Sequence, residues 1–438
     1  MRFLKTMLAQ ALALMLLLSC ALPAFAAPAA AQTDAAKQIS DTASALRDPA
    51  GRPLVVSKYG DKANYPENSA AAITAAAEAG ADLVQVYVRK TADNYFVLSA
   101  DENLSRMCVD ALGNVIDRNV SEMGYHELSA CHLRNGTGNL HEPITEYTVP
   151  TLEEAVEAAN AAGVLLVLEG AWAFREEIYE QLNAAGTLGS VVFLADGDRG
   201  EVVDWLESKS QMPLVFSAYT GNVVFSARST VSRTLSAGAV GTMLASANAY
   251  SVVFGDSVMS RFAEKGRGVI DMTDPALCGD REDNYIGYND VTARGYSVLV
   301  TDRITELCEY FARLSTERTR LNEALDKAQQ IDVTLCSTQS ANALKDAISD
   351  ARDALSAPAS ENSLMQARYA LELAVSGLTN RTQESDGKTV TAGRVAAAVL
   401  VVLALVALEV VIVRVRKKKQ EKRRRERRRA HEQKDEQD

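Results

Sequence analysis

Histidine is scarce in this chain: its 438 residues include only His126, His132, His141 and His431. Structural zinc sites use histidine and cysteine at set spacings, usually in pairs a few residues apart. Cys131 is directly followed by His132, which is not such a spacing. We therefore interpret this segment as a surface loop, and the histidines give no support for a zinc enzyme.

Positive charge is scarce outside the last residues of the chain. The net charge of −11 divides into +7 for residues 414–438, +2 for the first five residues and −20 for residues 6–413. An acidic surface favours solubility and disfavours polyanions that are held by charge alone. The sequence therefore argues against DNA or teichoic acid as a ligand, and no nucleic-acid partner is expected.

Cysteine is sparse and odd in number beyond the N-terminal region, where the chain carries Cys108, Cys131, Cys278, Cys308 and Cys336. An odd number leaves at least one thiol unpaired even in an oxidising compartment. Cys108 and Cys131 flank one loop and could pair, but the spacing does not fix the connectivity.

Long apolar runs are confined to the two ends of the chain. At the first end, Arg2 and Lys5 precede an apolar run over residues 8–18, and small residues follow at 24–26. This order is typical of a secretory signal peptide, predicted here over residues 1–26. Two alternatives stay open: lipidation of Cys20, whose preceding residues resemble a lipobox, and an uncleaved anchor.

At the other end, residues 395–413 are apolar apart from Glu409. About 19 residues at about 1.5 Å each just cross a bilayer core, so a transmembrane helix is predicted over 394–413. The basic tail over 414–438 places the C-terminus in the cytoplasm, in contact with anionic lipid. The preceding domains are then expected outside a single-pass cell-membrane protein.

Short apolar runs alternate with helical stretches between residues 52 and 314. Nine such runs are predicted as strands, and five stretches between them as helices. This alternation predicts an α/β fold, specifically a barrel, with an open doubly wound sheet as the alternative. The strands are expected near residues 55–56, 83–88, 96–98, 164–168, 191–194, 214–216, 240–243, 269–270 and 298–300, and the helices near 71–79, 152–161, 176–184, 201–208 and 257–265.

The sequence pattern changes over residues 317–378, where Ala and Leu recur at helical spacing in three stripes. Three amphipathic helices joined by short loops predict a small three-helix bundle. The segment resembles the FIVAR-type modules in stalks of Gram-positive surface proteins. Linkers are expected before and after the two domains, over residues 27–51 and 379–393.

An ordered series of motifs begins at the first predicted strand. It comprises Ser-Lys-Tyr-Gly at 57–60, Pro-Glu-Asn-Ser at 66–69, Gly-Ala-Asp at 80–82, Gln-Val-Tyr-Val at 85–88, Thr-Ala-Asp at 91–93, Ser-Ala-Asp at 99–101, Pro-Thr-Leu-Glu-Glu at 150–154, a strand ending in Glu169 and Val-Thr-Asp-Arg at 300–303. In spacing and order this series resembles the glycerophosphodiester phosphodiesterase family. The resemblance implies a TIM-type (β/α)8 barrel of the phospholipase-C-like phosphodiesterase class over residues 52–314.

The resemblance also implies a site whose chemical groups are largely replaced. Family members use two histidines for proton transfer and a divalent ion, Ca²⁺ or Mg²⁺, held by Glu-x-Asp and a later Glu. Here the histidine positions hold Lys58 and Ala100, and Tyr59 replaces an arginine. The Glu-x-Asp positions hold Gln85 and Tyr87, which leaves Glu169 as the retained metal-ligand position.

Hydrolysis of a phosphodiester needs charge neutralisation and proton transfer, which these substitutions remove. No intact catalytic set, no metal and no cofactor are therefore expected, and enzyme activity is left uncertain. The candidates for ligand binding are Lys58, Tyr59, Glu67, Gln85, Tyr87 and Glu169. Because buried polar groups need partners, we expect an ion pair between Lys58 and Glu169.

Three functions follow as hypotheses. The first is a membrane-anchored surface module that binds a glycan, a lipid headgroup or a protein without cleaving it. The second is an active phosphoric diester hydrolase with a remodelled site. The third is an inert spacer in which polar side chains fill the former site.

Overall fold

The computed structural model describes residues 29–248, 251–262, 265–356 and 358–379. The predicted signal peptide, transmembrane helix and basic tail, and the linker beyond residue 379, lie outside these ranges. Among the described residues, no helix combines the length and apolar character needed to cross a membrane.

Eight parallel strands form a closed barrel. The first, β1 (Leu54–Lys58), pairs on one side with β2 and on the other with β11, and the remaining strands pair in sequence between them. Because β1 has two neighbours, the sheet has no free edge among these eight strands, and the barrel is confirmed over the open sheet. The others are β2 (Leu83–Lys90), β6 (Leu165–Glu169), β7 (Val191–Ala195), β8 (Leu214–Thr220), β9 (Gly241–Ala245), β10 (Arg267–Asp271) and β11 (Tyr296–Thr301).

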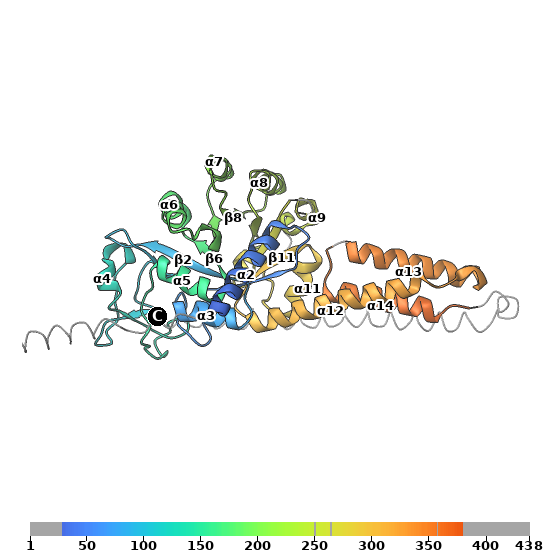
Figure 1. Ribbon diagram of the computed structural model, residues 1–438, viewed down its shortest axis with the longest axis horizontal. Coiled ribbons are helices and arrows are strands. Elements are labelled where there is room, and N and C mark those ends of the chain that lie inside the picture. The colour runs from blue at the N-terminus through green and yellow to red at the C-terminus, as the bar shows by residue number, and fades with distance from the viewer. Residues whose placement is uncertain (1–28, 249–250, 263–264, 357, 380–438) are drawn as a thin grey trace, which may run out of the picture. The chain divides into compact units, whose positions relative to one another are not determined.

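Helices follow the strands and cover the outside of the barrel (Figure 1). Helix α5 shows how the sequence sets the two ends of a helix. At its start, the Thr151 side chain accepts from the backbone N–H of Glu154, and the Glu154 side chain accepts from the backbone N–H of Thr151. At its end, Gly163 takes the left-handed conformation at φ 78°. Such reciprocal caps satisfy the free backbone groups of the first turn. The helices are α3 (Ala70–Glu78), α5 (Leu152–Ala162), α6 (Arg175–Ala185), α7 (Arg199–Ser208), α8 (Val224–Ser236), α9 (Asp256–Met259), α10 (Pro275–Cys278) and α11 (Tyr285–Ala293).

The inward side chains of the strands form the core of the barrel. Leu54 and Val56 of β1, and Leu165 and Val167 of β6, belong to one buried apolar cluster. Since side chains on one face of a strand recur every two residues, the next inward positions are the strand ends. In β1 and β6 these positions are Lys58 and Glu169, so the interior next to these two strands is apolar until their carboxyl ends, where it becomes polar.

Helix α2 (Ala29–Arg47) occupies most of the segment expected as a linker over 27–51. That expectation differs from the structure because Ile39, Ala43 and Leu46 recur at helical spacing and pack into the barrel core, where Leu46 is fully buried. The turn that follows is held by the buried Arg267, which donates to the backbone carbonyls of Gly51 and Arg52.

A segment between β3 (Phe96–Leu98) and α5 has an apolar core of its own. It contains the antiparallel pair β4 (Cys108–Val109) and β5 (His132–Leu133), and the short helices η1 (Val120–Glu122) and α4 (Tyr125–Leu128). Cys108 and Cys131 are buried in this core as free thiols, so the pairing considered from the sequence is not present.

The described chain divides into two compact units. The first comprises the barrel up to Asn322 together with Arg352–Ala367, and the second comprises Glu323–Ala351 and the chain from Arg368. The helices of the predicted bundle are α12 (Ile304–Gln329), α13 (Thr338–Ser356) and α14 (Glu361–Ser376), with the short η5 (Val333–Leu335) after α12.

Within the second unit, the apolar stripes predicted from helical spacing supply the buried side chains Leu325, Leu344 and Leu371. Ser337, just before α13, shares a 2.9 Å hydrogen bond with the Thr379 hydroxyl beyond α14. This hydrogen bond joins the start of α13 to the chain just after α14.

Candidate functional site

Polar side chains converge at the carboxyl ends of four barrel strands. Lys58 ends β1, Gln85 lies on β2, Glu169 ends β6 and Asp271 ends β10. Each continues the inward face of its strand. Active sites of TIM-type barrels lie at this end because the strands present their last residues there.

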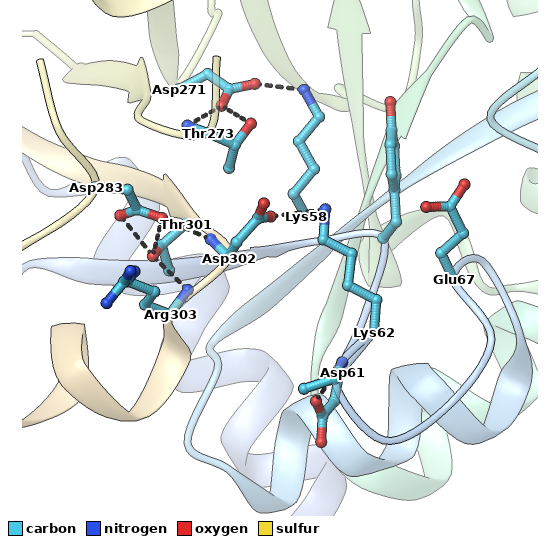
Figure 2. A network of polar contacts seen from close by, with 12 residues as sticks. Lys58, Asp61, Lys62, Glu67, Asp271, Thr273, Asp283, Thr301, Asp302 and Arg303 are labelled. Atoms are coloured by element: carbon cyan, nitrogen blue, oxygen red, sulfur yellow. Dashed lines mark hydrogen bonds and ion pairs between the residues drawn. The ribbon is translucent and has the colours of Figure 1, made fainter. Parts of the chain in front are cut away.

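Lys58 is paired with Asp271 and not with Glu169, so the expected ion pair was wrong. The Lys58 Nζ lies 2.5 Å from Asp271 Oδ2, and their side chains are 11% and 1% exposed. Figure 2 shows Lys58 directed at Asp271, whose Oδ1 also accepts from the Thr273 hydroxyl at 2.6 Å. Glu169 is engaged by other donors, which leaves Asp271 as the partner of the ammonium.

The environment keeps Lys58 charged. Burial works to lower its pKa, but the Asp271 and Glu169 carboxylates outweigh burial and raise the pKa above the usual 10.5. A lysine can act as a proton acceptor only when its pKa falls toward neutrality. Held in this pair as an ammonium, Lys58 is a poor proton acceptor.

Glu169 is held by two neutral donors. Its Oε2 accepts from the Tyr59 hydroxyl at 2.9 Å and from Gln85 Nε2 at 2.8 Å. Burial, and after it the Glu169 carboxylate, raises the pKa of Tyr59, so the phenol stays protonated and keeps donating. The three side chains thus form a fixed cluster from three segments of the chain.

Tyr59 reaches this position through an unusual backbone conformation. Its φ is 64°, a region that non-glycine residues rarely occupy. Its N–H donates to the Gln85 carbonyl at 2.8 Å and its carbonyl accepts from the Asn68 N–H at 2.9 Å. These bonds hold the strained turn in place. The following Gly60 is required by space, because a Cβ there would lie 2.6 Å from that of Ala72.

Tyr87 and Ala100 are joined through Arg89. The Arg89 guanidinium lies 4.4 Å from the centre of the Tyr87 ring, and its Nη2 donates to the Ala100 carbonyl at 2.7 Å. Gly170 lies close to the Tyr87 ring, because a Cβ there would lie 2.5 Å from a ring atom. Ala100 thus contacts Arg89 through its backbone carbonyl, and Tyr87 contacts it through the face of its ring.

Glu67 is engaged in an ion pair with Arg106. Arg106 lies 2.5 Å from both Glu67 Oε1 and Asp101 Oδ2, and it also donates to the Thr137 carbonyl. Arg106 therefore links the β1–α3 turn to the segment between β3 and α5. The structure assigns Glu67 to this link and brings Lys58, Tyr59, Gln85 and Glu169 together.

Sequence reasoning missed several acidic partners of the site. Asp271 could have been found, because it stands two residues after Val269 and so continues the inward face of β10. Lys62 Nζ lies 2.8 Å from Asp302 Oδ1. Figure 2 shows these two side chains next to each other. Asp283 accepts from the Thr301 hydroxyl at 2.8 Å and from the Asp302 N–H, and burial raises the pKa of its carboxyl. No motif indicated this last residue.

A divalent cation does not fit the residues present. Such ions need several oxygen ligands, usually anionic. Within the part of the chain that the structure describes, no group of three or more His, Cys, Asp or Glu side chains could hold a metal ion. Glu169 already accepts two hydrogen bonds on one oxygen, and its neighbour Gln85 is neutral.

Solved structures of low sequence identity resemble this chain. A glycerophosphoryl diester phosphodiesterase from Parabacteroides distasonis is 20% identical, with 63% of this chain and 92% of that chain covered and a TM-score of 0.49. A phosphodiesterase from Oleispira antarctica, solved with the product sn-glycerol-3-phosphate, is 17% identical, with 59% and 96% covered and a TM-score of 0.45. Because both scores lie below 0.5, the barrel assignment rests on the strand pairing described above.

The family match concerns the first half of the barrel. A comparison with curated proteins finds no match. The model of the glycerophosphoryl diester phosphodiesterase family matches residues 60–191, which include Glu67, Gln85 and Glu169. The chain is thus similar to the glycerophosphoryl diester phosphodiesterase family over residues 60–191.

Proposed function

We propose that the barrel is a binding module that has lost the metal-dependent hydrolysis of its family. One observation carries this proposal: the Glu169 carboxylate is hydrogen-bonded by Tyr59 at 2.9 Å and by Gln85 at 2.8 Å. Two neutral donors stand where the resemblance implies groups that serve an ion and a phosphate. The Glu169 carboxylate is therefore hydrogen-bonded within a polar cluster and is not available as one of several ligands to a metal ion.

The proton-transfer groups support the same proposal. Hydrolysis needs one group to take a proton from the attacking oxygen and another to deliver one to the leaving oxygen. Lys58 is kept protonated by Asp271 and Glu169, which raise its pKa. Ala100 has no side-chain proton to exchange. Neither position supplies the chemistry that two histidines supply in the family.

The setting of the module is also a proposal. The sequence at residues 1–26 and 394–438 favours export and a single membrane anchor with a basic cytoplasmic tail. The helices over 317–378 would act as a FIVAR-like stalk between barrel and membrane. The partners would then be membrane lipid at the anchor and a surface glycan, lipid headgroup or protein at the barrel.

A second candidate is an active phosphoric diester hydrolase with a rebuilt site. It is favoured by the family match over residues 60–191 and by the retained Glu169. For hydrolysis, Glu169 would have to give up its hydrogen bonds with Tyr59 and Gln85 and bind an ion or a water instead. An inert spacer is the remaining alternative, and it predicts that no small molecule binds at the cluster.

The experiment compares turnover and binding in the full-length protein. Release of glycerol 3-phosphate from glycerophosphodiesters is measured with Ca²⁺, with Mg²⁺ and with chelator, beside thermal unfolding under the same conditions. We expect no release and no ion-dependent stabilisation. Release that chelator abolishes, and that the Glu169→Ala variant lacks, would establish the hydrolase instead.

A further inference from the structure

Two buried amides at the carboxyl end of the barrel each keep one polar atom without a partner. Gln85 is 1% exposed and Asn68 is 2% exposed. Among the described residues, Gln85 Oε1 and Asn68 Nδ2 have no hydrogen-bond partner. Buried polar atoms are normally paired, so the two unpaired atoms call for an explanation.

The orientation of both amides is fixed by their other atom. Gln85 Nε2 donates to Glu169 Oε2 at 2.8 Å, and a carboxylate accepts only. Asn68 Oδ1 accepts from the Tyr87 backbone N–H at 2.9 Å, and an N–H donates only. The unpaired atoms are therefore one acceptor, on Gln85, and one donor, on Asn68.

The two amides belong to one connected cluster. The Asn68 N–H donates to the Tyr59 carbonyl at 2.9 Å, and the Tyr59 N–H donates to the Gln85 carbonyl at 2.8 Å. The side chain of the same tyrosine donates to Glu169. The cluster therefore holds one unpaired acceptor, one unpaired donor and one carboxylate.

The nearby cations are already neutralised. Lys58 is paired with Asp271 at 2.5 Å and Lys62 with Asp302 at 2.8 Å. Glu169, in contrast, has no cationic partner within 4 Å among the residues that the structure describes. A phosphate would approach the Glu169 and Asp271 carboxylates without gaining an unpaired cation.

We propose that the cluster of Tyr59, Asn68, Gln85 and Glu169 binds an uncharged hydroxyl of a polyol or sugar, in place of the phosphodiester. A hydroxyl donates and accepts at once, so it can pair with Gln85 Oε1 and Asn68 Nδ2 together. A phosphate oxygen only accepts, and the amide N–H of Asn68 disfavours a metal ion. This inference rests on the proposed binding function and names the class of its ligand.

The test uses matched probes that differ by one phosphate. Binding of glycerol and of sn-glycerol 3-phosphate to the full-length protein is compared by saturation-transfer NMR, and glucose is compared with glucose 6-phosphate in the same way. We expect both uncharged probes to bind and both phosphorylated probes to bind more weakly. This comparison needs no variant and stands even where a substitution impairs folding.

A pair of matched variants locates the binding. Asn68→Asp keeps the acceptor for the Tyr87 N–H and removes the free donor. The control is Asn94→Asp, because Asn94 also has a positive φ, 69°, but is exposed away from the cluster. We expect Asn68→Asp to weaken binding of glucose about tenfold, as the loss of one hydrogen bond does, and the control to leave it unchanged.

The outcomes separate this inference from the function on which it rests. Tighter binding of the phosphorylated probes, absence of binding by either uncharged probe, or equal effects of the two variants would overturn the inference and leave a silent barrel. Chelator-sensitive release of glycerol 3-phosphate from a diester would overturn the proposed function itself.

Discussion

Lys58 and Asp271 place opposite charges where little water reaches either of them. We expect Lys58→Met to lower the free energy of unfolding by about 3–5 kcal/mol, because it leaves the Asp271 carboxylate, which is 1% exposed, without its counter-charge. Chemical denaturation of the full-length protein measures the loss. The pair raises the pKa of Lys58 above 10.5, so its contribution is present at neutral pH and is lost only as the pH rises beyond that value.

The second lysine of the site provides the control for this substitution. Lys62 is paired with Asp302, whose side chain is 37% exposed, and an exposed pair contributes about 0–1 kcal/mol. Lys62→Met should therefore be nearly neutral. Equal losses in the two variants would mean that burial does not distinguish the pairs.

Acidic residues at the two positions where the resemblance implies them should create a site that binds a divalent ion. Gln85→Glu combined with Tyr87→Asp would give three carboxylates with Glu169, a set of hard oxygen ligands suited to Ca²⁺ or Mg²⁺. We expect thermal unfolding of this double variant to shift upward with the ion, by the equivalent of about 2.7 kcal/mol at 100 times the dissociation constant. Adding Glu169→Gln should remove the shift, and a wild type that responds equally would contradict the reasoning.

Among the elements, helix α2 packs into the barrel core with the fully buried side chain of Leu46. Leu46→Ala should destabilise the protein by about 2–5 kcal/mol, because it leaves a cavity among packed apolar residues. The control is Leu140→Ala, since Leu140 is 74% exposed and surface changes stay within about 0.5 kcal/mol. Similar midpoints of denaturation for both variants would show that α2 is only loosely attached.

The predicted strands agree with the structure more closely than the predicted helices do. Buried parallel strands appear as short apolar runs, which are visible without the fold. Helices α8 (Val224–Ser236) and α11 (Tyr285–Ala293) were missed, because Ser, Thr and Gly within them weaken the helical signal. The fold holds these segments in helical form by packing, which local propensity does not report.

The sequence was enough to predict the residue positions of the candidate site, but not the contacts between their side chains. The motif series singled out Lys58, Tyr59, Gln85 and Glu169, and the structure brings all four to one end of the barrel. Which carboxylate faces Lys58 depends on the path of β10, more than 200 residues away. Such a pairing follows from closure of the sheet and cannot be read from either segment alone.

For the whole molecule, we propose that the sequences at the two ends determine its location in the cell. We expect removal of residues 394–438 to move the protein from the membrane fraction to the medium, because those residues carry the long apolar run and the basic tail. Fractionation of expressing cells followed by immunoblotting measures this. Full-length protein that is soluble without detergent would contradict the anchor.

Barrel closure has a consequence for the order of folding. Val56 of β1 pairs with Leu83 of β2 but also with Val300 of β11, the last strand to be synthesised. Until β11 arrives, β1 and β10 are open edges that can recruit strands of other chains. Lys58 and Asp271 stand on these two strands, so their attraction forms only as β11 fills the gap. A chain that stops before residue 296 should therefore aggregate, because both edges stay available to its neighbours.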